Sequence, residues 1–330
     1  MKPATLVRRS EVGRRLPDFL LIGAPKAGST ALHDALAQHP QLYASPIKEP
    51  KYFLTGDSPP ARAGNRGPGD AHSAREWVWR RVHYERLFRA APPGTHTFES
   101  TPFYLWSRES HTRIAAALPH ARLVVVVRDP IDRAFSNWTH LRADGLEPEA
   151  DFLRACHLEQ LRVQAGWAPF WRYLELGRYG EQLQHLFDHF NPAQVLVIRY
   201  RQLIDAPEET LDRVCRFIGV DTGVLRGLPD SNLGRWAGDS AANRLLRRVV
   251  RAGAAAGSLT HPRLWRKAER PLRTLLQRGD LPRPRLDPAM RAQLVPQFTA
   301  DVALLSRLLD ADYFDWLTDE GRGAYTVRRS

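Results

Sequence analysis

Short apolar runs that end in loops recur along the chain and predict the strands of its fold. The runs lie at residues 18–23, 122–127 and 194–198, and each holds four or five consecutive apolar side chains. Continuous runs of this length are typical of strands that are covered on both faces in a parallel sheet. Stretches with helical spacing separate them. The pattern therefore predicts a three-layer α/β fold with a central, mostly parallel sheet and helices on both faces.

The rest of the chain divides into an arm and further helices. Residues 1–17 have no periodic pattern and predict a flexible basic arm, and residues 18–330 are expected to form a single domain. Helical spacing appears at residues 30–38 and again at 286–317, inside a helical C-terminal part that covers about 235–330. The apolar stripes of these helices are Ala31, Leu32, Ala35 and Leu36 in the first, and Leu304, Leu305, Leu308 and Leu309 in the second.

Positive charge is concentrated around one predicted helix. The chain carries 48 Lys and Arg against 36 Asp and Glu, and residues 235–285 hold 13 basic and three acidic side chains. Within them, residues 241–252 predict an amphipathic helix. Its apolar face is Leu245, Leu246, Val249 and Val250, and its basic face is Arg244, Arg247, Arg248 and Arg251. We expect the apolar face to pack on the core and the basic face to be solvated; a surface for an anionic acceptor or membrane headgroups is the alternative.

Composition argues against several protein classes. The two cysteines, Cys156 and Cys215, form no Cys-x-x-Cys pattern, which argues against a disulfide scaffold and a cysteine zinc site. No run of about 18 apolar residues is present, so we expect no membrane span. The apolar run at residues 19–22 is too short for the core of a signal peptide. We therefore expect a cytoplasmic protein, and the oligomeric state stays open.

The segment from Gly23 to Thr30 joins a predicted buried strand to a predicted helix. In this P-loop-like setting, backbone N–H groups and a helix N-terminus hold phosphate groups. The segment nearly matches the nucleotide pattern G-x-x-x-x-G-K-[ST], but Ser29 stands where that pattern has lysine, and Lys26 lies inside the loop. Kinases and NTPases use that lysine on the β- and γ-phosphates and the next hydroxyl on Mg²⁺. The departure therefore favours a shorter phosphate chain and no metal.

A second basic motif follows the predicted strand at residues 122–127. Arg128 stands at the carboxyl end of that strand, where a guanidinium can form charge-assisted hydrogen bonds with phosphate. Pro130 suits the first position of a helix and Asp129 its N-cap, and Ser136 lies two turns further on. The motif therefore predicts a second phosphate contact, from Arg128 and Ser136.

Together these motifs resemble those of sulfotransferases that use 3′-phosphoadenylyl sulfate (PAPS). Residues 24–30 resemble the loop that binds the 5′-phosphosulfate, and residues 128–136, RDPIDRAFS, resemble the motif that binds the 3′-phosphate. Residues 45–53, SPIKEPKYF, and 99–105, ESTPFYL, are similar to segments found in the heparan-sulfate-type branch and its bacterial relatives. The resemblance covers residues 18–140 well and 190–320 diffusely.

The resemblance implies a donor and a set of site residues. PAPS would be the co-substrate and adenosine 3′,5′-bisphosphate the product, without a metal. The implied donor-binding residues are Lys26, Ala27, Gly28, Ser29, Thr30, Arg128 and Ser136, and the implied catalytic residues are Glu49, as general base, and Lys26. Two departures from the branch matter. Ser100 replaces a lysine, and residues 231–238 are only a positional guess for the adenine loop, so heparan sulfate specificity is not implied.

The base and the acceptor leave alternatives open. In-line attack on sulfur needs a carboxylate that takes the acceptor proton. Glu49 is the first candidate, and Glu99 is a second candidate that could instead orient Lys26. The expected acceptor is a hydroxyl, with an amine as second choice, on a small molecule or carbohydrate such as a glycan, a glycolipid or a secondary-metabolite precursor.

Rival functions explain fewer of these features. A P-loop nucleotide kinase fits the loop except at Ser29, and a basic protein that binds nucleic acid or a membrane fits the charge of residues 241–285. Neither accounts for both phosphate motifs. We therefore expect no nucleic-acid partner and at most peripheral membrane contact through 241–285. His185 and His189 have a spacing that suits a metal, but no third ligand is evident, so we expect no metal requirement.

Overall fold

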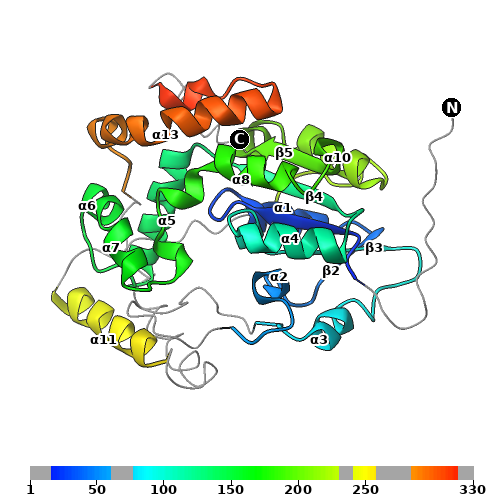
Figure 1. Ribbon diagram of the computed structural model, residues 1–330, viewed down its shortest axis with the longest axis horizontal. Helices are drawn as coiled ribbons and strands as arrows, with labels where there is room; N and C mark the ends of the chain where they lie inside the picture. The colour runs from blue at the N-terminus through cyan, green and yellow to red at the C-terminus, as the bar shows by residue number, and fades with distance from the viewer. Residues whose placement is uncertain (1–15, 61–76, 230–240, 258–283, 319–330) are drawn as a thin grey trace.

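The described part of the chain forms a parallel sheet that lies among helices (Figure 1). The computed structural model describes residues 16–60, 77–229, 241–257 and 284–318, so the predicted arm (except residues 16 and 17) and the guessed adenine loop at 231–238 lie outside the described residues. The strands are β1 (Phe19–Gly23), β2 (Leu42–Ala44), β3 (His96–Ser100), β4 (Arg122–Val127) and β5 (Val195–Arg199). Their order is β2-β3-β1-β4-β5, and every pairing is parallel. The predicted central parallel sheet is confirmed.

Helices make up most of the remaining described residues. The α-helices are α1 (Ser29–Leu36), α2 (Tyr52–Thr55), α3 (Arg81–Arg86), α4 (Arg108–Ala117), α5 (Pro130–Ala143), α6 (Phe152–His157), α7 (Glu159–Gln164), α8 (Tyr179–Phe187), α9 (Tyr200–Asp205), α10 (Pro207–Ile218), α11 (Ala241–Gly257) and α13 (Pro288–Leu309). The 3-10 helices are η1 (Pro102–Tyr104), η2 (Pro169–Trp171), η3 (Glu175–Gly177), η4 (Pro192–Gln194) and η5 (Phe314–Leu317).

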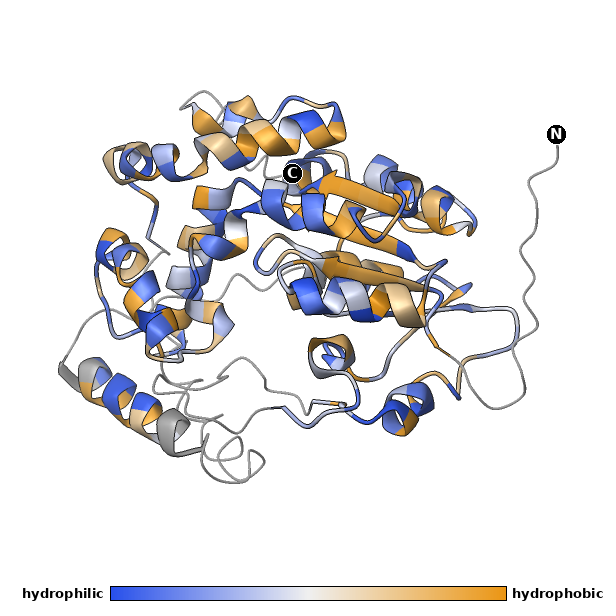
Figure 2. Ribbon diagram, viewed as in Figure 1, coloured by the Kyte–Doolittle hydropathy of each residue, from blue (hydrophilic) through white to orange (hydrophobic). Residues whose placement is uncertain are grey.

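The strands that the apolar runs predicted are the hydrophobic centre of the fold. Residues Leu123 to Val127 of β4 are fully buried, and the strands stand out as apolar in Figure 2. Burying one such side chain stabilises the fold by roughly 1.5–3 kcal/mol. β2 and β3 have no apolar run, because β2 is only three residues long and β3 carries polar side chains such as Thr97 and Glu99. The sequence therefore showed no sign of β2, and it indicated β3 only as a short β-like segment ending near Glu99.

The strand order places helices on both faces. From the central β1 the chain moves outward to β2, returns to β3 and crosses to β4 and β5. Crossovers between parallel strands are right-handed, so connections that run in opposite directions along the sheet cover opposite faces. α1 therefore lies on one face, and α4 and α8, which contact each other, lie on the other. The three-layer prediction is confirmed.

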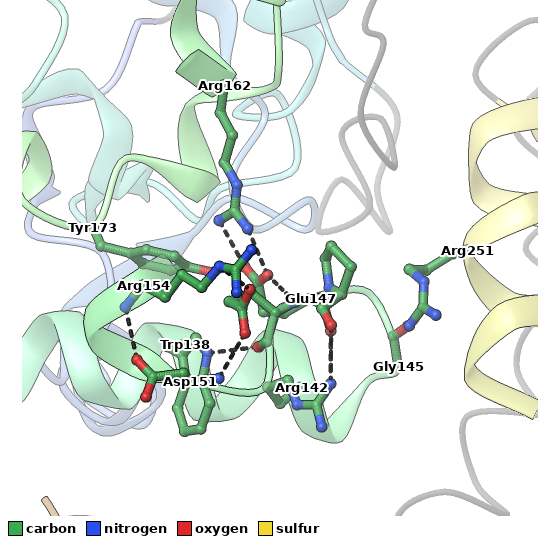
Figure 3. Close-up of polar contacts among 11 residues, drawn as sticks. Trp138, Arg142, Gly145, Glu147, Asp151, Arg154, Arg162, Tyr173 and Arg251 are labelled. Carbon is green, nitrogen blue, oxygen red and sulfur yellow. Dashed lines mark hydrogen bonds and ion pairs between the residues drawn. The ribbon is translucent and has the colours of Figure 1, made fainter. Parts of the chain in front are cut away.

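Helix α11 presents a different face to the protein than its sequence predicted. Arg247 is 2% exposed and Val250 is fully buried, whereas Leu245 is 63% and Val249 48% exposed. Arg251 donates a hydrogen bond to the carbonyl of Gly145, 3.2 Å away (Figure 3). The expectation of a buried apolar face and a solvated basic face was therefore wrong for Arg247, Leu245 and Val249, although Val250 is buried and Arg248 is exposed as expected. Arginine can bury its long apolar stem when its guanidinium finds an acceptor, and a helical pattern alone does not show such acceptors.

A buried ion pair fixes the turn that follows α5. Glu147 is fully buried and receives two hydrogen bonds from the Arg162 guanidinium, at 2.7 and 2.9 Å, and a third from the Tyr173 hydroxyl (Figure 3). Trp138 of α5 donates to the carbonyl of Glu149 at 3.1 Å. Because the Arg162 guanidinium pairs with it, the buried Glu147 charge is compensated, and the pair ties the turn after α5 to α7.

The C-terminal helix α13 packs against α8 and α5. Leu305 is buried as predicted, but Leu304, Leu308 and Leu309 are only half-buried. Its buried face instead runs through Arg291, Leu294, Phe298, Asp301, Val302, Leu305 and Ser306. The leucine stripe therefore predicted only part of the buried face, because polar side chains with buried partners share this face.

Candidate functional site

The carboxyl ends of the strands bring the two predicted motifs together. The backbone N–H of Ala24, after β1, donates to the carbonyl of Val126 in β4 at 2.7 Å. On the other side of β1, the N–H of Thr101 donates to the carbonyl of Leu21 at 3.1 Å. The loop at residues 23–30 is thus flanked by the end of β4 and the end of β3. Ligands of open α/β sheets bind at this edge.

The loop is built to let backbone approach a ligand. Gly28, the N-cap of α1, has φ of 99°, and a Cβ at this position would lie 2.7 Å from the ring of Tyr200. Only glycine fits such a position. Lys26 also has a positive φ, 64°. Ser29 and Thr30 form the first turn of α1, whose N–H groups have no partner within the helix and suit an anion.

Arg128 lies beside this loop, as its place after β4 predicted. Its guanidinium approaches the carbonyl of Lys26, with a nitrogen–oxygen distance of 3.5 Å, and lies over the ring of Tyr200, 4.9 Å from the centroid. The ring thus covers one side of the guanidinium and also leaves no room for a Cβ at Gly28. Tyr200 was not predicted, although it follows the apolar strand β5 at the same edge as Arg128.

A buried arginine lies behind the loop. Arg133 of α5 is fully buried, and its guanidinium donates to the carbonyl of Pro25 at 3.4 Å and to the carbonyl of Tyr173. Burial lowers the pKa of this guanidinium from its usual value, because it disfavours the charged form. Even so, an arginine keeps its charge in proteins, so Arg133 adds positive potential behind residues 23–30.

The start of α5 is organised as predicted. The Asp129 carboxylate caps the helix by accepting hydrogen bonds from the N–H groups of Ile131 and Asp132, at 2.9 and 3.1 Å. Asp129 also pairs with the buried Arg291 of α13. Ser136 is half-buried on the same helix. Asp129 is thus engaged by protein groups, as expected of an N-cap.

The segment before α2 carries Glu49 to the same edge. The N–H of Glu49 donates to the carbonyl of Ser100, at the end of β3, at 3.0 Å. Its neighbour Lys48 donates from Nζ to the hydroxyl of Thr30 at 2.6 Å. Glu49 itself is half-buried. The structure therefore brings Lys26, Glu49 and Arg128 to one edge of the sheet.

Glu99 is in a different environment from Glu49. It is 0% exposed, and its carboxylate accepts hydrogen bonds from the hydroxyls of Tyr84 (3.1 Å), Tyr104 (2.8 Å) and Thr101 (2.8 Å). Burial raises the pKa of Glu99 to about 7; the three hydroxyls oppose this shift, and the negative charge of Glu49 adds to it. The two carboxylates are therefore close enough to interact, but only Glu49 reaches solvent.

The histidine pair on α8 joins neighbouring helices. Nδ1 of His185 lies 2.9 Å from Nδ1 of His111, and Nε2 of His189 lies 3.3 Å from the hydroxyl of Thr112. Burial lowers the pKa of His111 to about 4. Among residues with described positions, no group of three or more His, Cys, Asp or Glu side chains is arranged to hold a metal ion. None of the described helices is long and apolar enough to cross a membrane.

Comparisons with known proteins agree with this geometry. The chain is 29% identical over 219 residues to human heparan sulfate glucosamine 3-O-sulfotransferase 3A1, covering 66% of this chain and 48% of that protein. It is 30% identical over 220 residues to mouse bifunctional heparan sulfate N-deacetylase/N-sulfotransferase 4, covering 64% of this chain and 23% of that protein. The chain thus spans about half the length of the first relative and less of the second.

A solved structure and a family profile extend the comparison. The crystal structure of a sulfotransferase from Alicyclobacillus acidocaldarius aligns with a TM-score of 0.70 at 26% identity, covering 92% of this chain and 100% of that chain. The profile described as the sulfotransferase family matches residues 17–223, which include the loop at 23–30, Glu49 and the Arg128 motif. The protein therefore belongs to the sulfotransferase family.

Proposed function

We propose that the protein transfers the sulfuryl group of PAPS to a hydroxyl of a carbohydrate or small-molecule acceptor. One observation carries this proposal: Lys48 lies 2.6 Å from Thr30, which brings Glu49 beside the loop at 23–30. A cradle for an anion and a half-exposed carboxylate thus meet at one edge of the sheet. Sulfuryl transfer requires both.

The donor would span the two motifs. Lys26, Ala27, Gly28, Ser29 and Thr30 would hold the 5′-phosphosulfate, through the first-turn N–H groups of α1 and the Lys26 ammonium. Arg128 and Ser136 would hold the 3′-phosphate. Two contacts of Tyr200 support a donor that spans both motifs: the ring lies close to Gly28 of the loop, and it lies over the Arg128 guanidinium.

Glu49 would act as the general base. The acceptor oxygen attacks sulfur in line, a new S–O bond forms, and the bond between sulfur and the bridging oxygen of the 5′-phosphate breaks. The acceptor proton passes to the Glu49 carboxylate, and Lys26 stabilises the charge that grows on the leaving phosphate. A base must lie within hydrogen-bond reach of the acceptor. The complete burial of Glu99 and its three hydroxyl donors therefore favour Glu49.

The acceptor is proposed from the relatives and the site. Two relatives are named for O-sulfation and N-sulfation of heparan sulfate, so we infer a carbohydrate hydroxyl first and an amine second. Ser100 stands where the heparan-sulfate-type branch has lysine, and the acceptor therefore need not be heparan sulfate. The proposed reaction uses no metal, because Lys26 and Arg128 would supply the positive charge.

Calorimetric titration tests the donor site. We expect adenosine 3′,5′-bisphosphate to bind with micromolar affinity in the presence of EDTA, because the proposed contacts all come from the protein, and ATP with Mg²⁺ to bind at least about tenfold more weakly. Tighter binding of ATP with Mg²⁺ would instead support the kinase. Absence of binding by either nucleotide would overturn the proposed function.

Peripheral membrane contact is proposed for α11 on a separate observation. The exposed side chains of Leu245 and Val249 lie one turn apart, next to the exposed Arg248. Apolar side chains flanked by arginine suit the surface of an anionic membrane. We expect Leu245→Ser with Val249→Ser to reduce co-flotation with phosphatidylserine vesicles, whereas Leu161→Ser, at another exposed leucine on α7, leaves it unchanged. Equal flotation of all three proteins would refute the contact.

A further inference from the structure

The fully buried carboxylate of Glu99 lies under the segment that carries Glu49. Glu99 belongs to β3, and the N–H of Glu49 is bonded to the carbonyl of the next residue, Ser100. The carboxylate is bonded to three hydroxyls, from Thr101, Tyr104 and Tyr84. This arrangement places one buried acceptor at the centre of the contacts below Glu49.

Two of these hydroxyls also contact the backbone of the segment above. The Thr101 hydroxyl accepts from the N–H of Lys51 at 3.4 Å, and the Tyr104 hydroxyl accepts from the N–H of Phe53 at 3.2 Å. A hydroxyl has a single hydrogen. Because both hydroxyls donate that hydrogen to Glu99, their lone pairs are left to face the backbone N–H groups. The carboxylate therefore makes both hydroxyls acceptors for the backbone N–H groups of Lys51 and Phe53.

The segment needs such support because its backbone is strained. Glu49 has φ of 57° and Lys51 has φ of 62°, on either side of Pro50. Side-chain-bearing residues rarely adopt this left-handed conformation, and it persists only where the surroundings hold it. If the contacts at Lys51 and Phe53 were lost, the turn would relax, and the Glu49 side chain would move with it.

We propose that Glu99 is a positioning residue for Glu49: through Thr101 and Tyr104 it holds the strained turn at 49–51 in the conformation that presents the Glu49 carboxylate to the acceptor. This inference rests on the proposed role of Glu49 as the base. Glu99 touches neither donor nor acceptor in this role.

The positioning depends on the charge of Glu99. The titratable groups that act on its carboxylate are Tyr84, Tyr104 and Glu49, and its pKa is about 7. An ionised carboxylate only accepts hydrogen bonds, whereas a protonated one must donate its own hydrogen. Acidification through pH 7 therefore turns one of the surrounding hydroxyls away from Glu99. We expect kcat to fall over this range, with little change in bisphosphate affinity.

Two tyrosines offer a matched pair of variants. Tyr104→Phe and Tyr84→Phe each remove a buried hydroxyl that donates to the same oxygen of Glu99. Only Tyr104 also accepts from the N–H of Phe53. We expect Tyr104→Phe to lower kcat by about tenfold or more, because a base displaced by a fraction of an ångström loses its alignment, and Tyr84→Phe to lower it by about threefold at most. Both variants should bind adenosine 3′,5′-bisphosphate as the wild type does.

The readout is transfer of ³⁵S from labelled PAPS to the best acceptor of a panel of glucosamine oligosaccharides, glycolipids and phenols. Hydrogen–deuterium exchange of the peptide that contains residues 49–55 gives a second readout without an acceptor. Exchange of this peptide should speed up in Tyr104→Phe, which removes the acceptor of the Phe53 N–H, and not in Tyr84→Phe. Equal effects of the two tyrosine variants on both readouts would overturn the inference.

A second set of variants separates the positioning role from a general loss of folding and tests the charge of Glu99 by itself. Thr101→Val removes the hydroxyl and should lower kcat, and Thr101→Ser restores the hydroxyl and should rescue it. Glu99→Gln should give a low kcat that no longer changes between about pH 6 and 8. The positioning role would be refuted if the kcat of Glu99→Gln still fell on acidification through pH 7. It would also be refuted if the kcat of Thr101→Val equalled that of the wild type. Failure of the wild type to bind adenosine 3′,5′-bisphosphate would instead refute the proposed function.

Discussion

Glu49→Gln is expected to lower kcat by about 10²–10⁴-fold, the usual contribution of a general base, while the dissociation constant of adenosine 3′,5′-bisphosphate stays within about twofold. Glutamine keeps the size of the side chain, and the backbone bond from residue 49 to Ser100 is unaffected. The amide cannot take the acceptor proton. The effect should therefore appear in the chemical step, measured by single-turnover transfer of ³⁵S from PAPS, and not in donor binding.

The control for this variant is Glu209→Gln. Glu209 is exposed in the first turn of α10 and is not among the residues proposed to bind donor or acceptor, and its variant has the same change in net charge. We expect it to turn over like the wild type. Normal turnover by Glu49→Gln would remove Glu49 from the mechanism. If Glu99→Gln then lost all activity while the turn at 49–51 kept its exchange protection, Glu99 would be the base.

The second large effect tests which phosphate of the donor each of the two motifs binds. Arg128→Met is expected to weaken binding of adenosine 3′,5′-bisphosphate by about 10- to 100-fold, since hydrogen bonds to a charged group contribute about 1.5–3 kcal/mol. It should leave the affinity for adenosine 5′-monophosphate nearly unchanged, because that ligand has no 3′-phosphate. Lys26→Met should weaken the binding of both ligands by similar factors, because both have a 5′-phosphate. Calorimetric titration of each variant with each ligand measures the four affinities.

Arg216→Met is the matched control for charge. Arg216 is exposed in the last turn of α10, and its loss changes the net charge as Arg128→Met does. We expect normal affinity for both ligands, apart from a small effect that added salt removes. If Arg128→Met lowered the affinity for both ligands equally, Arg128 would contact the 5′-phosphate. That result would contradict the assignment of Arg128 to the 3′-phosphate.

Local features of the site were predictable because they depend on a few neighbouring residues. The loop at 23–30 follows a buried strand and precedes a helix, and Arg128 and Asp129 follow the next long apolar run. The N-cap role of Asp129 followed from Pro130 alone and is confirmed. Aromatic support from another element was missed. Tyr200 is the clearest case, since its contacts with Gly28 and Arg128 join residues that are far apart in the chain.

By itself, the sequence determined the parallel α/β fold and the two motifs proposed to bind phosphate, because apolar run length, glycine positions and proline positions act over short distances. Only the tertiary structure decided which carboxylate is accessible. Glu49 and Glu99 each have one polar neighbour in sequence, Lys48 and Ser100, yet strand pairing buries Glu99 under three hydroxyls and leaves Glu49 half-exposed beside Thr30. It also decided that α11 buries Arg247 and exposes Leu245, because the groups that cover one face of a helix come from other parts of the fold.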